Sequence, residues 1–202
     1  MHPLFDLTGR VALVTGAGAP DGIGFATARL LGELGATVAL AATSDRVHQR
    51  AADLTDLGVD AIGVVGDLTD ERGAARVVRE VTEARGAPTI LVNNAGMTSV
   101  TRPALDTGAE SGRLGDIVRD VWQQAIARNL DTAFLTTRAA LPGMVEAGWG
   151  RVVMVTSVTG PVMAMRAEAA YAAAKAAMVG LTRSAAVDYA GDGVTVNAVA
   201  PG

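Results

Sequence analysis

Residues 11–24 read Val-Ala-Leu-Val-Thr-Gly-Ala-Gly-Ala-Pro-Asp-Gly-Ile-Gly. A short apolar run passes directly into glycines, and apolar residues then recur at helical spacing until Gly35, which predicts a strand, a tight loop and a helix. Glycines let a backbone approach a pyrophosphate, and the free N–H groups at a helix start stabilise its charge. The candidate phosphate-binding residues are Gly16, Gly18, Asp21, Gly22, Ile23 and Gly24.

The same stretch is also compatible with a plain strand-to-helix turn. In the dinucleotide fingerprint Gly-x-Gly-x-x-Gly, a third glycine would follow Gly16 and Gly18 at position 21, where this chain has Asp21. The chain contains 24 glycines, so their presence in one loop is weak evidence by itself. Both interpretations stay open when the loop is considered alone.

Short β-branched runs alternate with longer helical stretches along the whole chain. Because most of these runs are continuously apolar, they are typical of parallel strands covered by helices on both faces. Right-handed crossovers then predict an α/β, doubly wound parallel sheet, and 202 residues suit a single domain covering residues 1–202. We expect strands at 10–15, 37–42, 60–65, 89–93, 151–156 and 194–199, and helices at 23–34, 45–57, 70–85, 117–147 and 168–189.

The composition limits the kinds of partner and site. There is no cysteine, which excludes disulfides, thiolate nucleophiles and cysteine-ligated zinc, and His2 and His48 have no metal-ligand partner at useful spacing, so no metal site is expected. A net charge of −4 argues against nucleic acid. No apolar run is long enough for a membrane span, and the first ten residues lack a secretory signal, so a cytoplasmic protein with a small-molecule partner is expected.

Residues 98–116 break the pattern, because Gly108, Gly112 and Gly115 mix there with Ser, Thr and acidic residues. They predict a long loop. A loop of this length in a compact domain is usually either a binding loop or a disordered one, and the sequence favours neither.

Tyr171 and Lys175 are four residues apart in an Ala-rich helical stretch, so their side chains are expected on one face of the helix. A phenol holds its proton tightly at neutral pH, and an ammonium about 5 Å away stabilises the phenolate by roughly 3 kcal/mol at an effective dielectric of about 20. Lys175 is the only lysine of the chain, and the other long basic side chains are all arginine. This choice indicates a chemical demand for a compact, tunable cation. The alternative is that Lys175 is a solvated surface lysine without a chemical role.

Two more polar residues have a candidate role. Ser157 follows the fifth predicted strand, at the edge where open α/β sheets bind ligands, and its hydroxyl can donate to a carbonyl oxygen. Asn129 lies within a long predicted helix. Taken singly, Ser157 is as consistent with a helix cap, and Asn129 with a polar residue in a bent helix.

Together these motifs resemble the classical short-chain dehydrogenase/reductase family over essentially all 202 residues, and so imply a Rossmann fold. The resemblance is carried by Thr15-Gly16 with Gly22-Ile23-Gly24, Asp67-Leu68-Thr69, Asn93-Asn94-Ala95-Gly96, Asn129, Ser157, Tyr171-x-x-x-Lys175 and Pro201-Gly202. One departure is clear: five residues instead of the family's three separate Gly16 from Gly22.

The resemblance implies an oxidoreductase that moves hydride between NAD(P)H and a carbonyl or alcohol. Ser157 would polarise the substrate carbonyl, Tyr171 would deliver or take the proton, Lys175 would also hold the nicotinamide ribose, and Asn129 would complete a proton relay through water. The other implied cofactor contacts are Asp67 and Leu68 at the adenine, Asn94, Ala95 and Gly96 near the ribose, and Pro201 and Gly202 beside the nicotinamide.

The choice between NADP(H) and NAD(H) depends on the residues after the second strand. Ala42 stands where NAD-preferring relatives carry an acid, and Thr43, Ser44 and Arg46 can donate to a 2′-phosphate, which resembles 3-oxoacyl-carrier-protein reductases. Asp21 opposes this, because many phosphate users carry arginine in that loop. We favour NADP(H), with NAD(H) as the alternative.

The favoured substrate is a carbonyl compound of the 3-oxoacyl thioester class. The alternative is a non-catalytic dinucleotide-binding sensor or scaffold, and a hydrolase is disfavoured because the chain lacks a Gly-x-Ser-x-Gly elbow. The family also implies a homo-oligomer, a dimer or tetramer, formed through the helices at 117–147 and 168–189. Its further helix and last strand, which follow Pro201-Gly202 and cover the substrate, are not part of these 202 residues.

Overall fold

The computed structural model describes residues 5–96 and 112–202, which build one six-stranded sheet flanked by helices. The strands are β1 (Val11–Thr15), β2 (Thr37–Ala42), β3 (Ala61–Val65), β4 (Ile90–Asn93), β5 (Gly150–Val155) and β6 (Val194–Val199). All neighbouring strands pair in parallel, in the order β3-β2-β1-β4-β5-β6. The predicted doubly wound parallel sheet is confirmed, and each strand begins and ends within one residue of its expected bounds.

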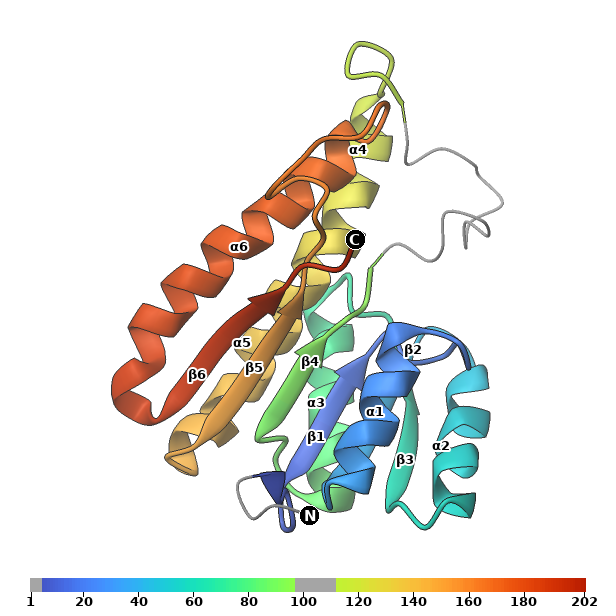
Figure 1. Ribbon diagram of the computed structural model, residues 1–202, viewed down its shortest axis with the longest axis vertical. Helices are drawn as coiled ribbons and strands as arrows, with labels where there is room; N and C mark the ends of the chain where they lie inside the picture. The colour runs from blue at the N-terminus through green and yellow to red at the C-terminus, as the bar shows by residue number, and fades with distance from the viewer. Residues whose placement is uncertain (1–4, 97–111) are drawn as a thin grey trace.

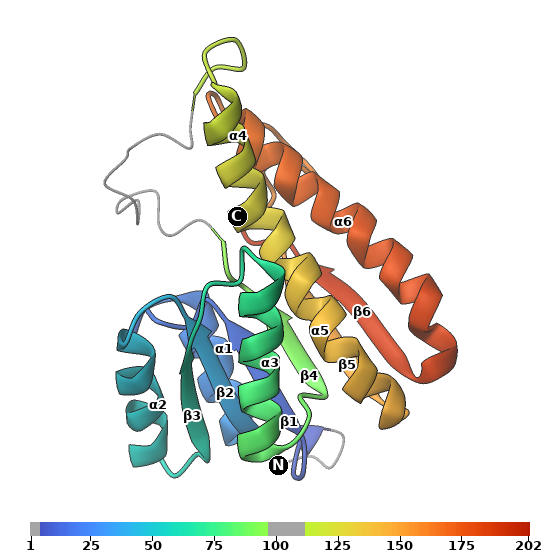
Figure 2. The ribbon, with the colours of Figure 1, turned by 180° about the vertical axis from the view of Figure 1, so that it is seen from behind.

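Helices cover the sheet on both faces (Figures 1 and 2). Figure 1 shows α1 and α2 on the near face, and Figure 2 shows α3, α5 and α6 on the other. The bounds are α1 (Ile23–Glu33), α2 (Arg46–Asp56), α3 (Glu71–Arg85), α4 (Arg119–Ile126), α5 (Thr132–Glu146) and α6 (Ala169–Tyr189), with a 3-10 turn at Ala190–Asp192.

Each face of the sheet has its own apolar core. Leu13, Leu91 and Met154 pack towards the α3, α5 and α6 side, while Val14 and Leu40 pack towards α1 and α2. Successive strand residues point to opposite faces, so strands buried on both faces must be apolar throughout. This requirement explains why the strands read as continuous apolar runs.

The prediction of one continuous helix over 117–147 was wrong. It is divided into α4 and α5 by a π-helical segment, η2 (Ala127–Asp131). The amide of Asn129 donates to the carbonyl oxygen of Ala125 at 3.0 Å, and the Thr132 hydroxyl donates to the carbonyl oxygen of Arg128 at 2.9 Å. Side chains that bond to helix carbonyls compete with the regular backbone pattern, which gives a physical reason for the wider turn.

The sheet order reverses between β1 and β4, because β1 leads outward to β2 and β3 whereas β4 leads to β5 and β6. In open α/β sheets the crevice at such a switch point, outside the carboxyl ends of the strands, is where ligands bind.

Most of the loop predicted at 98–116 lies outside the described residues, which resume at Gly112. The N–H of Gly112 donates to the carbonyl oxygen of Ala167, just before α6, at 2.7 Å. No helix of the described ranges is long and apolar enough to cross a membrane.

Candidate active site at the carboxyl edge of the sheet

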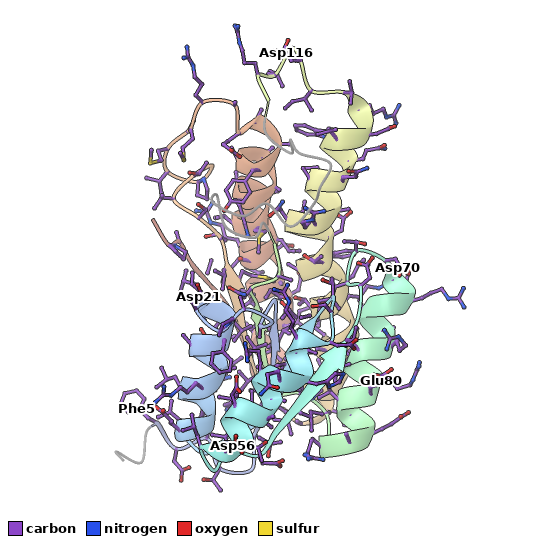
Figure 3. All side chains as sticks on the ribbon, turned by 90° about the vertical axis from the view of Figure 1, so that its right-hand side faces the viewer. Phe5, Asp21, Asp56, Asp70, Glu80 and Asp116 are labelled. Carbon is purple, nitrogen blue, oxygen red and sulfur yellow. The ribbon has the colours of Figure 1, made fainter. Side chains whose placement is uncertain are left out.

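The predicted site residues gather at one edge of the sheet. Figure 3 shows Asp21, before α1, and Asp70, before α3, at about the same height in the middle of the view, with Asp116 near the top and Asp56, at the end of α2, near the bottom. Asp21 follows β1 and Asp70 follows β3, so both mark the edge at which the parallel strands have their carboxyl termini. The candidate phosphate and ribose residues come from loops and a helix start at this edge, while Asn129 comes from η2 and Lys175 from within α6.

The glycine loop packs against the segment that follows β4. Gly16 has a φ of +68°, and a Cβ there would lie 2.8 Å from the Cα of Ala95. A Cβ on Gly24 would lie 2.6 Å from Nδ2 of Asn94. No larger residue fits either position without displacing the backbone around it, so these two glycines are required for the close approach of the two segments.

Thr15 ties the same two segments together. Its hydroxyl oxygen accepts from the backbone N–H groups of Asn94 at 3.0 Å and Ala95 at 2.9 Å, and its hydroxyl donates to the carbonyl oxygen of Val92 at 3.3 Å. The Asn94 amide in turn donates to the carbonyl oxygens of Thr15 and Gly16, both at 3.1 Å. The candidate ribose residues 94–96 are thus held in register with the candidate phosphate loop.

The two additional residues of the glycine loop form an exposed turn. The N–H of Gly22 donates to the carbonyl oxygen of Ala19 at 3.3 Å, and Ala19, Pro20 and Asp21 are exposed. Gly22 is the N-cap of α1, and no described side chain caps this helix start. The first-turn N–H groups lack partners within the helix and remain available to a phosphate, so the longer loop still fits the pyrophosphate of a dinucleotide.

The end of β2 lies beside the glycine loop. A Cβ on Gly18 would be 3.1 Å from the Cβ of Ala42, and the N–H of Ala17 donates to the carbonyl oxygen of Ala41 at 3.2 Å. Beyond Ala42, Nε of the exposed Arg46 donates to the hydroxyl oxygen of Ser44 at 3.3 Å. The structure thus brings Ser44 and Arg46 together within one turn of the chain.

Asp67 closes a turn after β3. Its carboxylate accepts from the Thr69 hydroxyl at 2.7 Å and the Thr69 N–H at 2.9 Å, and these hydrogen bonds, with the nearby charge of Arg128, hold the pKa of Asp67 below its usual value. Leu68 is 4% exposed and packs in the core. An adenine contact by Leu68 would therefore have to come from its backbone.

Lys175 and Asn129 converge on Gly96. A Cβ on Gly96 would lie 3.1 Å from Oδ1 of Asn129 and 3.3 Å from Nζ of Lys175. Asn129 is fully buried within η2, and Lys175 is 4% exposed on α6. Residues from the β4 loop, the π-helical turn and α6 thus meet at one point beside the switch point of the sheet.

The ammonium of Lys175 is held by the end of β5. Its Nζ donates to the carbonyl oxygen of Val155 at 2.9 Å and lies 3.6 Å from the sulfur of Met178. The same Nζ is 5.8 Å from the ring centroid of Tyr171, close to the separation expected from helix spacing. Burial lowers the pKa of Lys175 from 10.5 to about 8, because a desolvated ammonium is less stable than a hydrated one.

Ser157 follows β5 and is half-buried. Its hydroxyl oxygen accepts from the N–H of Thr159 at 3.1 Å. The next residue, Val158, donates its N–H to the carbonyl oxygen of Pro201 at 3.0 Å. A Cβ placed on Gly202 would lie 3.8 Å from the side chain of Val158. The candidate nicotinamide segment 201–202 therefore lies beside the serine loop.

Sequence reasoning missed two supporting groups. Thr15, 1% exposed, organises the phosphate loop, and the carbonyl oxygen of Val155 holds Lys175. The role of Thr15 could have been predicted, because it is a hydroxyl residue at the end of an otherwise apolar buried strand. The role of Val155 could not have been predicted from its residue type, because only its backbone carbonyl takes part. Across 5–96 and 112–202, no three His, Asp or Glu side chains gather closely enough to hold a metal ion.

Known proteins are similar to this chain in sequence and fold. The chain is 38% identical over 196 residues to oxidoreductase UcpA of Escherichia coli (strain K12), covering 97% of this chain and 70% of the relative. It is 38% identical over 197 residues to the 3-oxoacyl-(acyl-carrier-protein) reductase FabG of Pseudomonas aeruginosa, covering 97% and 74%. A gluconate 5-dehydrogenase from Burkholderia cenocepacia, solved with NADP and tartrate, matches with a TM-score of 0.86 and 32% identity over 98% of this chain and 72% of the other.

The match extends beyond individual relatives to a family model. The model described as short chain dehydrogenase matches residues 10–202, which include the glycine loop, Ser157, Tyr171 and Lys175. The chain therefore belongs to the short-chain dehydrogenase/reductase family and is an NAD(P)-dependent oxidoreductase.

Proposed function

We propose that this chain transfers hydride between NADP(H) and a carbonyl or alcohol carbon, with 3-oxoacyl thioesters as the favoured substrate class, and that residues 1–202 act as one domain. The observation that carries the proposal is the convergence of the Lys175 ammonium and the Asn129 amide oxygen on Gly96, beside a glycine loop with an uncapped helix start. This arrangement combines a dinucleotide site with a proton-handling site.

The cofactor supplies or accepts the hydride when it is bound, and the protein's part is to hold and orient it. The amides at the start of α1 would receive the pyrophosphate. Asn94 to Gly96, fixed against Thr15, would border the ribose, and Asp67 with the backbone of Leu68 would border the adenine. Pro201 and Gly202, anchored to Val158, would limit the nicotinamide position.

The proton chemistry is assigned to Tyr171. In the reducing direction its phenol gives a proton to the developing alkoxide, and in the oxidising direction its phenolate takes one from the alcohol. The Lys175 ammonium, 5.8 Å from the centroid of the ring, stabilises the phenolate through its positive charge. After reduction Tyr171 must regain its proton; Lys175 would pass one to it, and Asn129, with its side-chain oxygen towards Gly96, would position a water that reprotonates Lys175.

Ser157 is assigned to the substrate carbonyl. Because its oxygen accepts from the N–H of Thr159, the hydroxyl proton is free to point away from that bond and towards a substrate oxygen. A donor aimed at an oxygen that gains charge in the transition state typically contributes 10²- to 10³-fold to the rate.

Two features support an acyl substrate. The reductase from Pseudomonas aeruginosa, which is 38% identical, acts on a 3-oxoacyl group by name. In this chain the segment between Ser157 and Tyr171 exposes Val162, Met163 and Met165, with Val162 77% exposed. Flexible apolar side chains suit an acyl chain better than a polyhydroxylated sugar acid.

The preference for NADP(H) rests on the end of β2. Position 42, where NAD-preferring relatives carry an acid, is Ala42 in this chain, and the guanidinium of Arg46 lies beside the Ser44 hydroxyl. The gluconate 5-dehydrogenase that shares this fold was solved with NADP. Asp21 in the exposed turn opposes the preference through its charge, and for this reason NAD(H) is the alternative cofactor.

We also propose a homo-oligomer formed through α5 and α6. The exposed face of α6 carries the small residues Ala176, Ala177 and Gly180, and Val187 on the same helix is 79% exposed. Small side chains let helices approach closely, and an exposed apolar stripe is stabilised when a second copy covers it.

The test is a cofactor-oxidation assay with NADPH and NADH across 3-oxoacyl thioesters, simple ketones and sugar acids. Turnover of 3-oxoacyl thioesters with NADPH at the highest kcat/KM is the expected result. Turnover of another carbonyl class would reject the substrate assignment but keep the chemistry. Cofactor binding by calorimetry with no turnover of any carbonyl would instead support a non-catalytic sensor or scaffold.

A further inference from the structure

Gly160 occupies a position that only glycine can take. Its φ is +104°, in the region that L side chains rarely adopt, and a Cβ there would lie 2.2 Å from the carbonyl oxygen of Ala172. Ala172 belongs to α6 and directly follows Tyr171. The loop that leaves β5 therefore approaches the backbone of α6 at the residue that follows Tyr171.

The same loop carries Ser157, three residues before Gly160. Within it the N–H of Thr159 donates to the Ser157 hydroxyl oxygen at 3.1 Å, and the N–H of Gly160 donates to the carbonyl oxygen of Met163 at 2.7 Å. On its other side the loop is anchored by the bond from Val158 to the carbonyl oxygen of Pro201. Two contacts relate this segment to the helix that bears Tyr171: Lys175 donates to the carbonyl oxygen of Val155, before Ser157, and Gly160 meets Ala172 beyond it.

We propose that Gly160 is a positioning residue that sets the distance between the Ser157 hydroxyl and the Tyr171 phenol. Both groups must reach one substrate oxygen, so a displacement of the loop from α6 separates the two donors. Any side chain at position 160 must move either the loop or the carbonyl of Ala172. This inference rests on the proposed function in one respect, namely that Ser157 and Tyr171 act on the same substrate oxygen.

The chain contains a matched control for the steric effect. Gly193, before β6, has a φ of +75°, and a Cβ there would also lie 2.2 Å from a backbone carbonyl oxygen, that of Gly148. Gly193 precedes β6 at the amino end of the sheet, whereas Pro201 and Gly202 follow the carboxyl end of the same strand, and its carbonyl oxygen contacts the start of β5. Gly193→Ala therefore introduces the same clash at the opposite edge.

The experiment compares Gly160→Ala, Gly193→Ala, Ser157→Ala and the double variant Ser157→Ala/Gly160→Ala. Each is measured for thermal unfolding, NADPH affinity and kcat on the best carbonyl substrate. We expect Gly160→Ala to lower kcat by about 10- to 100-fold with unchanged NADPH affinity, since a displacement near 1 Å has that effect. In the Ser157→Ala background the same change should cost nothing further, while Gly193→Ala should leave kcat within about twofold of the wild type.

Amide hydrogen exchange supplies a readout that needs no turnover. Loss of the hydrogen bond to Ser157 should speed exchange at the N–H of Thr159 in both Gly160→Ala and Ser157→Ala, and not in Gly193→Ala. A wild type without carbonyl turnover would count against the proposed function alone, because the exchange comparison still tests the position of the loop.

Three results would overturn the positioning role. The first is a kcat of Gly160→Ala equal to that of Gly193→Ala, with exchange at Thr159 unchanged. The second is a full additional loss of kcat in the Ser157→Ala background, which would mean that Gly160 acts independently of the serine. The third is a Gly160→Ala chain that does not fold although Gly193→Ala does, which would make Gly160 a residue needed for folding.

Discussion

Replacing Lys175 with methionine should change how the stability of the cofactor-free protein depends on pH. Lys175 is 4% exposed, and burial lowers its pKa from 10.5 to about 8. Between these two values the folded protein has released the proton, whereas the unfolded chain still binds it. Because the unfolded state then binds more protons, the free energy of unfolding rises with pH across this interval and is constant, as far as this group is concerned, below about 8 and above 10.5.

The size of the effect follows from the same interval. A separation from about 8 to 10.5 corresponds to about 3 kcal/mol at roughly 1.36 kcal/mol for each pH unit. For a chain of this length that is roughly 6 to 12 °C in Tm. Methionine fills a similar volume without a titrating group. The stability of the wild type relative to Lys175→Met should therefore increase by about 3 kcal/mol from pH 7 to pH 10.5.

Urea unfolding followed by circular dichroism at several pH values measures this difference directly. Lys175 is the only lysine of the chain, so no other lysine side chain contributes to this difference. If the difference in unfolding free energy between the wild type and Lys175→Met stays constant within about 1 kcal/mol from pH 7 to pH 10.5, Lys175 is not desolvated in the folded state and the claim is refuted.

Three further results are expected. Arg46→Ala should weaken NADPH binding about 10- to 100-fold by calorimetry and leave NADH binding nearly unchanged, because a charge-assisted bond contributes roughly 1.5 to 3 kcal/mol; equal losses for both cofactors would remove Arg46 from the 2′-phosphate. Lys175→Ala should weaken NADPH binding at pH 7, and unchanged affinity would exclude its ribose contact. Light scattering at micromolar concentration should give a dimer or tetramer mass, and a monomer mass would contradict the interface on α5 and α6.

The fold was predictable because its signals are local and repeated. Each strand must be apolar along its whole length to be buried on both faces, so the pattern of apolar runs located all six strands within one residue. The π-helical turn at 127–131 was not predictable in this way. It accompanies a side-chain hydrogen bond from Asn129 to the carbonyl oxygen of Ala125, a contact that leaves the apolar pattern of the helix unchanged.

The site was predictable where its chemistry requires a side chain. Tyr171 and Lys175 follow from helix spacing, and the structure brings Lys175 together with Asn129 at Gly96 as their joint candidacy requires. The carbonyl oxygen of Val155 and the contact of Gly160 with α6 could not be found from sequence, because backbone groups and tertiary contacts make both. The roles assigned to Tyr171, Lys175, Asn129 and Ser157, and to the cofactor contacts, all stay predictions.

The central claim is that Tyr171 transfers the proton, and the most direct measurement is kcat together with NADPH affinity for Tyr171→Phe. The other tyrosine, Tyr189, lies at the far end of α6, so Tyr189→Phe is the matched control. We predict that Tyr171→Phe loses at least about 100-fold in kcat, the usual contribution of a general acid, with NADPH affinity unchanged, and that Tyr189→Phe behaves as the wild type. A Tyr171→Phe enzyme that keeps its kcat within tenfold of the wild type would contradict the account, because another group would then supply the proton.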